Sequence, residues 1–150
     1  LITTTDLKNT ILPVTLRMPG KTNLKEILHN INPRLLDETF VFITSSEPLE
    51  DLINSLKPKA TFLEDEGITL VINQKAADAH SLQYDGIFKC ISLGVHSSLE
   101  SHGLISTITR ELTKHKISSN IFSGYFHDHI FVQNNLAAEA LKVISSLEDS

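Results

Sequence analysis

Hydrophobic residues in the second half of the chain alternate between strand and helix spacing. One side of a predicted strand carries Ile87, Ile91, Leu93 and Val95, and Lys89 interrupts its start. Residues 98–115 predict a helix whose inner face is Leu104, Ile105, Ile108 and Leu112. A strand over 119–126, a return strand over 130–132 and an amphipathic helix over 136–147 complete this half.

The first half has the same kinds of segment in a less regular form. Asn23 is a candidate N-cap for a helix with apolar positions at Leu24, Ile27, Leu28, Ile31 and Leu35, which Pro33 ends or bends near Asn32. A strand over 39–44, two helical turns over 49–56, a hairpin turning at 64–67 and a helical turn over 74–80 follow. We expect the first ten residues to form a loose arm and residues 10–17 a short edge strand.

The order strand–helix–strand–strand–helix therefore occurs twice, at 39–80 and at 86–148. This order predicts an α+β fold of two ferredoxin-like halves in tandem, with mixed or antiparallel sheets and helices on one face. The expected boundaries are an arm or edge strand at 1–23, a first module at 24–84 and a second module at 85–150. Each half lacks one strand of a full unit, so we expect open sheet edges.

Charge and cysteine content narrow the possible functions. Eighteen acidic and thirteen basic residues give a net charge of −5, and no basic stripe is present, which argues against nucleic-acid and membrane partners. Cys90, the single cysteine, lies among apolar residues and is expected in the core. Without a disulfide, a bilayer-spanning apolar run or a signal-peptide pattern, the chain is expected to be cytoplasmic.

Three short patterns resemble catalytic or cofactor motifs without completing them. The Pro-Gly-Lys-Thr sequence at 19–22 has Thr15 where a phosphate-binding loop needs glycine. Serines follow histidines at 80–81 and 96–98, as in a hydrolase, but none of them lies on a nucleophile elbow. His127 and His129 would lie on one side of a strand and could share a metal ion, with His96, His102 or Glu100 as a third ligand. The alternative is a solvated bend, so we predict no catalytic residue, metal or cofactor.

The segment from Gly94 to Gly103 is a candidate binding loop. A strand ends and a helix begins there, so free backbone N–H groups and the positive end of the helix dipole suit a carboxylate. Ser97 and Ser98 would serve equally well as plain helix caps. The residues by themselves leave both interpretations open.

Several stretches resemble the ACT domain. They are 88–93, 103–105, 117–121 and above all Gly-Tyr-Phe-His-Asp-His-Ile-Phe-Val at 124–132, with 40–42 and 61–71 agreeing in the first half. The chain resembles small bacterial proteins with two ACT modules in tandem. It is more distantly similar to the regulatory half of aspartate kinases and to the cytosolic arginine sensor of animals. The resemblance covers residues 24–148.

The resemblance implies a ligand site at the contact between two ACT modules. It would involve the loop after the first strand of a module and the facing second strand. The matching residues here are Gly94, His96, Ser97, Ser98, Leu99, Glu100, Gly103, Ser119, Asn120, Ile121, Phe122 and Ser123. An aspartate-rich pattern of the kinase loops is absent, which leaves the ligand open.

An amino-acid ligand would place its three groups on different residues of this site. Its carboxylate would meet the helix start and Ser97 or Ser98, and its ammonium group would meet Glu100 and strand carbonyls. Its side chain would lie against Ile121 or Phe122, and His96 could tune the affinity with pH.

The sequence thus predicts a non-catalytic regulatory or sensor module that binds a small molecule, most simply an amino acid. A structural interaction module without a ligand is the alternative. A metal-dependent enzyme using His127 and His129 is the third hypothesis. Expected partners are a second copy of the chain, paired through open sheet edges, and an unidentified regulated protein.

Overall fold

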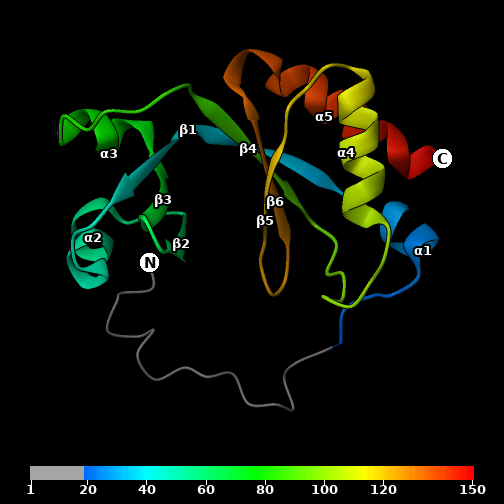
Figure 1. Cartoon of the computed structure of the whole chain (residues 1–150). Helices are drawn as coiled ribbons and strands as arrows, with labels where there is room; N and C mark the ends of the chain where they lie inside the picture. The colour runs from blue at the N-terminus through cyan, green and yellow to red at the C-terminus, as the bar shows by residue number, and fades with distance from the viewer. Residues whose placement is uncertain (1–18) are drawn as a thin grey trace.

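The computed structural model describes residues 19–150. One six-stranded sheet of order β2-β3-β1-β4-β6-β5 organises the molecule, and every neighbouring pair in it is antiparallel (Figure 1). The strands are β1 (Pro33–Ser45), β2 (Ala60–Glu64), β3 (Gly67–Asn73), β4 (Phe88–Leu93), β5 (Asn120–Ser123) and β6 (Asp128–Gln133). The helices are α1 (Leu24–Leu28), α2 (Leu49–Leu56), α3 (Gln74–Ala79), α4 (Leu104–Lys114) and α5 (Ala137–Ser145), with 3₁₀ turns η3 (Asn134–Leu136) and η4 (Ser146–Asp149).

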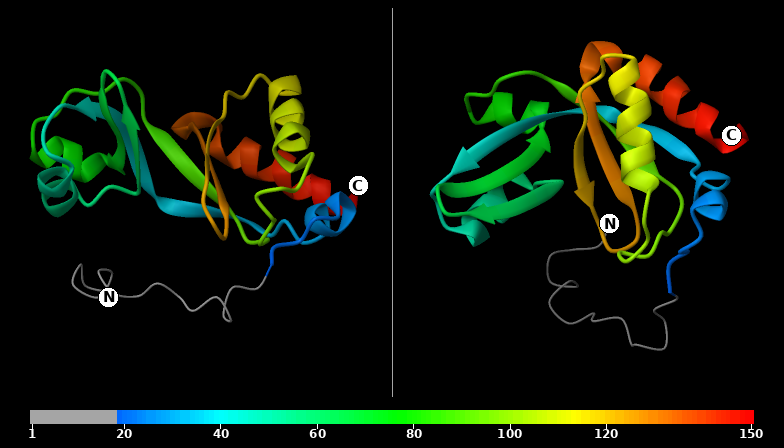
Figure 2. Two further views of the ribbon diagram at one scale, coloured as in Figure 1. Left: turned by 60° about the horizontal axis from the view of Figure 1, so that its bottom comes forward. Right: turned by 45° about the vertical axis from the view of Figure 1, so that its right-hand side comes forward.

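The long strand β1 joins the two halves. Its first residues, Pro33 to Leu35, pair with β4, and its last residues, Phe40 to Ser45, pair with β3. The left panel of Figure 2 shows β1 running from one half of the molecule to the other. β1 and β4 therefore each lie in the fourth-strand position of the other half, which supplies the strand that each half lacked in sequence.

Lys89, which interrupts the apolar pattern of β4, hydrogen-bonds to the backbone of a bulge in β1. From Leu35 to Thr39, β1 advances by four positions, whereas the partner strand advances by only two, from Ile91 to Lys89. The Lys89 ammonium donates to the carbonyls of Leu36 and Asp37 at 3.2 and 2.5 Å. A charged donor thus replaces the ladder bonds that the bulge removes.

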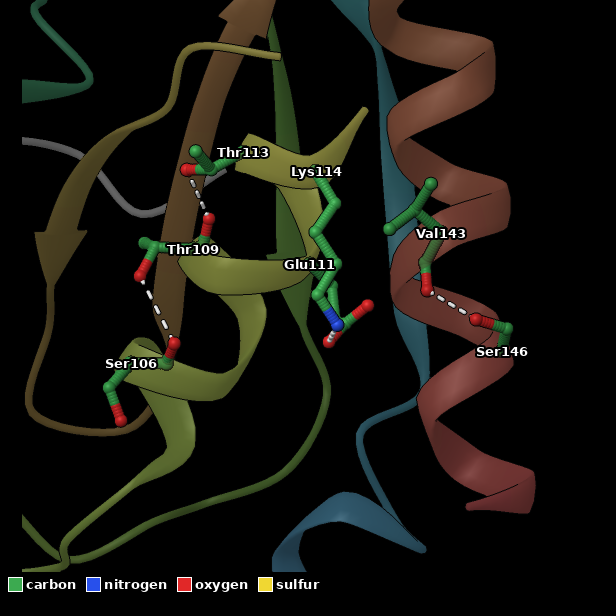
Figure 3. Close-up of polar contacts among 7 residues, drawn as sticks. All are labelled: Ser106, Thr109, Glu111, Thr113, Lys114, Val143 and Ser146. Atoms are coloured by element: carbon green, nitrogen blue, oxygen red, sulfur yellow. Dashed lines mark hydrogen bonds and ion pairs between the residues drawn. The ribbon is translucent and has the colours of Figure 1, made fainter. Parts of the chain in front are cut away.

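All five helices pack on one face of the sheet, as predicted. Helices α1, α4 and α5 cover β4 and β6 through Ile91, Leu93, Ile130 and Val132, while α2 and α3 cover β1 and β3 through Val41, Leu70 and Ile72. On the exposed side of α4, hydroxyls bond to carbonyls of the preceding turn, as Thr113 does to Thr109 at 2.7 Å and Thr109 to Ser106 at 3.3 Å (Figure 3).

The opposite face of the sheet carries an aromatic cluster contributed by strands. Phe40, Phe42 and Phe122 surround the fully buried Phe131 with ring centroids 5.6–6.0 Å apart. Cys90 lies in this cluster and is fully buried, as expected, and burial raises the pKa of its thiol to about 11. Cys90 is therefore a core residue with little thiolate at neutral pH.

Several predicted elements differ in extent from the structure. The helix expected to end or bend near Asn32 ends at Leu28, and Leu35, expected on its apolar face, lies in β1, because Asn32 adopts a left-handed φ of 42° and Pro33 begins the strand. The helix expected from residue 98 begins at Leu104, and the strand expected over 119–126 is limited to Asn120–Ser123. The strand expected at 10–17 and most of the 1–23 arm lie outside the described residues.

The strand expected over 39–44 is longer, since β1 begins at Pro33. The order of the remaining elements agrees with the predictions, as does the Asn23 cap, whose side chain accepts from the Glu26 N–H at 3.2 Å. No helix in the described part of the chain is long and apolar enough to cross a membrane.

Candidate functional site

The loop between β4 and α4 is held in place by the start of the described chain. The Lys21 N–H donates to the His96 carbonyl at 2.9 Å, and the Ser98 N–H donates to the Lys21 carbonyl at 2.8 Å. Gly20 lies so close that a Cβ atom on it would be 2.5 Å from backbone atoms of Ser97 and Ser98. The Pro-Gly-Lys-Thr sequence thus forms a clamp on this loop, and glycine is required there by contact with backbone.

A cavity of about 210 Å³ opens between this loop, the first turn of α4 and the β5–β6 turn. Its lining residues are Ser97, Ser98, Leu99, Ser101, Gly103, Leu104, Ile105, Ser106, Ser123, Gly124 and Asp128. Five of them are serines, so the uncharged polar side chains of the lining are all hydroxyl-bearing.

Asp128 supplies the negative charge of the cavity. It is 7% exposed, and it is the one buried polar or charged residue of the described chain. Strand alternation places it on the same side of β6 as Ile130 and Val132, facing α4. The Ser97 hydroxyl donates to its Oδ2 at 3.4 Å, a long contact that leaves most of the carboxylate's capacity to accept hydrogen bonds unused.

The first turn of α4 supplies the partial positive charge of the cavity, from the N-terminal end of the helix dipole. The Thr107 N–H bonds to the Gly103 carbonyl at 2.9 Å, so the N–H groups of Leu104, Ile105 and Ser106 precede the helical pattern. Gly103 itself has φ of +97° and lies against Leu24, which requires glycine before the helix. The cavity therefore has a helix N-terminus on one wall and a buried carboxylate on another.

The predicted site residues divide between the cavity and other surroundings. Ser97, Ser98, Leu99, Gly103 and Ser123 line it. Gly94 and His96 line a separate cavity of about 600 Å³ together with Lys21, His29 and Glu148. Glu100 is exposed and is not part of either lining.

The facing strand contributes fewer residues than predicted because its side chains alternate. Ile121 packs in the core cluster under α4, whereas Phe122 points to the aromatic face of the sheet. Asn120 has the same parity as Phe122, and Ser119 precedes the strand. Of this stretch, only Ser123 reaches the cavity.

Ser101 lies within the predicted 94–103 loop but was not among the named site residues, and the lining residues Leu104, Ile105, Ser106, Gly124 and Asp128 were not predicted. Asp128 could have been found, since it shares its parity with the apolar Ile130 and Val132 and so had to face the helices. The serines of the helix start gave no such signal, because the helix begins six residues later than expected.

The first half has a cavity of its own, of about 420 Å³, lined by Ile43, Thr44, Ser45, Glu47, Leu52, Ser55, Leu56, His80, Leu82 and Gln83. There, β1 ends at Ser45 and α2 begins at Leu49, so the connection is short. Gly67, at the β2–β3 turn, lies where a Cβ atom would be 2.9 Å from the Thr44 hydroxyl and 3.1 Å from the Ser45 carbonyl oxygen. The connection after the first strand of each half is therefore longer in the second half, where the 94–103 loop lines the cavity of about 210 Å³.

The two histidines proposed as metal ligands have different surroundings. The His127 Nδ1 lies 3.4 Å from the Val95 carbonyl, whereas the buried His129 Nδ1 has no hydrogen-bond partner among residues 19–150. Burial lowers the pKa of His129, and the nearby charges of Lys59 and His127 lower it further. Within residues 19–150, no group of three or more His, Cys, Asp or Glu side chains is placed to hold a metal ion.

Both halves of the chain match known protein-family models. Models of the ACT domain match residues 19–89 and residues 87–146. A Vibrio cholerae protein of unknown function, described as a possible transport protein, is 38% identical and covers 83% of this chain and 95% of its own, with a TM-score of 0.76. The chain belongs to the tandem ACT-domain family.

Other solved structures share the fold at low sequence identity. An Agrobacterium tumefaciens protein is 14% identical over 79% of this chain and 90% of its own, with a TM-score of 0.66. Escherichia coli aspartokinase III, solved with aspartate and ADP, is 9% identical over 79% of this chain and 33% of its own, with a TM-score of 0.58. A search of curated protein sequences finds no match.

Proposed function

We propose that this tandem ACT protein is a non-catalytic regulatory module that binds an amino acid in the cavity beside α4. The observation that carries the proposal is the pairing of a free helix N-terminus with the buried Asp128 carboxylate in one small cavity. An α-amino acid carries a carboxylate and an ammonium group on the same carbon atom, so it complements both the helix N-terminus and the Asp128 carboxylate. The family membership supports the regulatory role, since ACT domains are typically regulatory and non-catalytic.

The ligand carboxylate is assigned to the first turn of α4. The N–H groups of Leu104, Ile105 and Ser106 and the helix dipole favour a negative group at that end. α4 runs over Leu104–Lys114, long enough for the effect of its dipole at the first turn.

The ligand ammonium group is assigned to Asp128 in place of Glu100. Asp128 lines the cavity and is almost fully buried, whereas Glu100 is exposed and lies outside the lining. A charge-assisted hydrogen bond to a shielded carboxylate is stronger than one to a carboxylate in water. Removing Asp128 should therefore affect binding more than removing Glu100.

Thermal-shift and calorimetric titration of the whole chain against the proteinogenic amino acids tests the proposal. A ligand present at about 100 times its Kd stabilises a protein by about 2.7 kcal/mol, which raises Tm measurably. Asp128→Asn, which keeps the shape of the side chain, should weaken binding about tenfold or more. Glu100→Gln, the matched control in the same site region, should leave the affinity unchanged.

Two outcomes would contradict this assignment. No shift with any amino acid at millimolar concentration would favour the structural interaction module instead. Equal losses in the two variants would place the ammonium group away from Asp128.

We further propose that two copies associate through the β2 edge, so that a signal passes through assembly or to a partner protein. β2 is an end strand of the sheet, and its Phe62 and Leu63 are 64% and 65% exposed. An exposed apolar edge strand is a template for pairing, and two-fold symmetry is the commonest arrangement.

Light scattering during size-exclusion chromatography tests this association. The wild-type chain should be a dimer at tens of micromolar, and Leu63→Lys should be monomeric because a charge then lies in the paired edge. Ile53→Lys, at a 37% exposed residue of α2, is the matched control and should remain dimeric. A wild-type monomer would contradict the proposal.

A further inference from the structure

The charged side chains that line the cavity beside α4 are of one sign, negative. Asp128 is the one charged side chain among the described residues of its lining, and the remaining polar side chains belong to Ser97, Ser98, Ser101, Ser106 and Ser123. Lys21, the basic residue nearest in the loop clamp, lines the separate larger cavity instead. A ligand in the cavity beside α4 therefore meets one negative side chain and no positive one.

We propose that this cavity selects an amino acid with an uncharged polar side chain and rejects acidic amino acids. The inference rests on the proposed function, in which Asp128 neutralises the ligand ammonium and α4 meets the ligand carboxylate. With these two groups engaged, the lining has no charged side chain left for a third ionic group. A second carboxylate would lie within a few ångströms of Asp128 in a partly shielded space, where like charges repel strongly.

The hydroxyl groups of the lining have capacity left for a neutral polar side chain. The Ser106 hydroxyl donates to the Gly103 carbonyl at 3.1 Å, so its oxygen can still accept. The Ser98 hydroxyl accepts from the Glu100 N–H at 3.2 Å, so its proton can still be donated. The cavity thus offers both an acceptor and a donor, which suits an amide or a hydroxyl of the ligand.

An apolar side chain would fit the same space less well. It would cover the serine hydroxyls without replacing their hydrogen bonds to water, which costs free energy for each group left unpaired. The apolar part of the lining, Leu104 with Ile105 and Leu99, accommodates the carbon atoms of a small side chain.

The first test compares amino acids of equal shape and different charge by isothermal titration calorimetry on the whole chain. Asparagine and aspartate form one pair, glutamine and glutamate a second, and leucine represents apolar side chains. The acidic member of each pair should bind about tenfold or more weakly than its amide, because its side chain has no cationic partner. Leucine should also bind more weakly than asparagine.

The second test places a cation in the lining. Ser101→Lys adds an ammonium group at a half-buried lining residue, and His102→Lys adds one at the adjacent exposed residue, outside the lining. Ser101→Lys should reduce or reverse the preference for asparagine over aspartate, whereas His102→Lys should leave the preference as it is in the wild type. Circular dichroism confirms that both variants are folded.

The outcomes separate the two proposals. If aspartate binds as tightly as asparagine, or leucine binds more tightly than both, the selectivity is wrong while amino-acid binding stands. Equal effects of the two lysine variants would likewise overturn the cavity lining as the source of selectivity. If no amino acid of the panel binds, the proposed function fails and the selectivity fails with it.

Discussion

Asp128 and His129 are adjacent in the chain and lie on opposite faces of the sheet. Alternation along β6 turns Asp128 toward α4 and the cavity, and turns His129 toward the aromatic face beside its cross-strand partner Phe122. One residue has a use for its charge in the proposed site, whereas the other is a half-buried imidazole whose Nδ1 has no hydrogen-bond partner in the described part of the chain. The same dipeptide therefore carries a candidate ligand-binding group and a group that folding tolerates at a cost.

His129 should make the protein less stable as the pH falls. The pKa of His129 lies below its ordinary value of 6.5 because of burial first, then the charges of Lys59 and His127, with Asp128 acting in the opposite direction. As the pH falls, His129 is therefore protonated at a higher pH in the unfolded chain than in the folded chain. The free energy of unfolding is at its full value above about pH 7 and declines as the pH falls through about 6.5 toward the folded-state pKa. His129→Phe keeps a ring and should show a smaller decline in urea midpoint between about pH 7.5 and 5.5.

His102→Phe makes the same chemical change at an exposed residue and is the control for this measurement. Its decline with pH should match that of the wild type. A wild-type decline in His129→Phe would mean that burial of His129 has no thermodynamic consequence.

At the scale of elements, the shape of the 94–103 loop depends on the chain segment that precedes α1. Backbone bonds from Lys21 to His96 and Ser98 form a parallel bridge, and Gly20 allows the two backbones to touch. Two of the residues so fixed, Ser97 and Ser98, line the cavity. The clamp therefore links a glycine distant in sequence to the geometry of the proposed site.

Gly20→Ala should weaken both stability and amino-acid binding. The added methyl group would lie 2.5 Å from the carbonyl carbon of Ser97 and the backbone nitrogen of Ser98, and neither backbone can move away cheaply. We expect a loss of about 1–3 kcal/mol in unfolding free energy by urea denaturation. Hydrogen exchange of the Ser98 amide should become faster, since that N–H is bonded to the clamp.

Lys21→Ala is the matched control, because it shortens an exposed side chain and keeps both backbone bonds of the clamp. It should stay within about 0.5 kcal/mol of the wild type. Equal stability of the Gly20→Ala and Lys21→Ala variants would show that the close approach of Gly20 to the loop does not affect the free energy of unfolding.

At the scale of the whole molecule, the two ACT domains share their central strands. The start of β1 pairs with β4, and Ile27 and Ile31, which precede β1, are fully buried in the core under α4 and α5. A chain boundary at residue 85 would therefore divide the second core, even though the sequence pattern repeats there. The boundary at 84/85 stays a prediction about sequence modules rather than about independent folding units.

The fragment 85–150 should consequently fail to fold alone. It would lack the strand beside β4 and the buried side chains of Ile27 and Ile31, and each buried isoleucine contributes about 2–5 kcal/mol against removal. Circular dichroism and heteronuclear NMR should show an unfolded or aggregated fragment, with the fragment 19–150 as the folded control. Cooperative unfolding of 85–150 by itself would contradict the shared core.

The local sequence determined most of the elements and their order. Periodicity and turn residues located β1 around residues 39–44, the β2–β3 hairpin, the Asn23 cap and the repeated strand–helix order, because those features depend on neighbours within a few positions. The same local reasoning failed where a distant contact decides the outcome. Leu35 fits helical spacing but pairs with Ile91 in the sheet, since Asn32 takes a left-handed conformation and Pro33 begins a strand.

Only the tertiary structure decided which residues form the candidate site. The loop was predicted from the strand end, the helix start and the resemblance to the ACT domain, but Asp128 lines the cavity and Glu100 does not because β6 packs beside the first turn of α4. The alternation along β6 places Asp128 on the helix-facing side, but which helix turn lies beside its carboxylate is set by packing between elements far apart in the chain. The merging of two modules into one sheet has the same origin, because strand pairing between β1 and β4 is a long-range contact whose free energy is gained only when both halves are folded together.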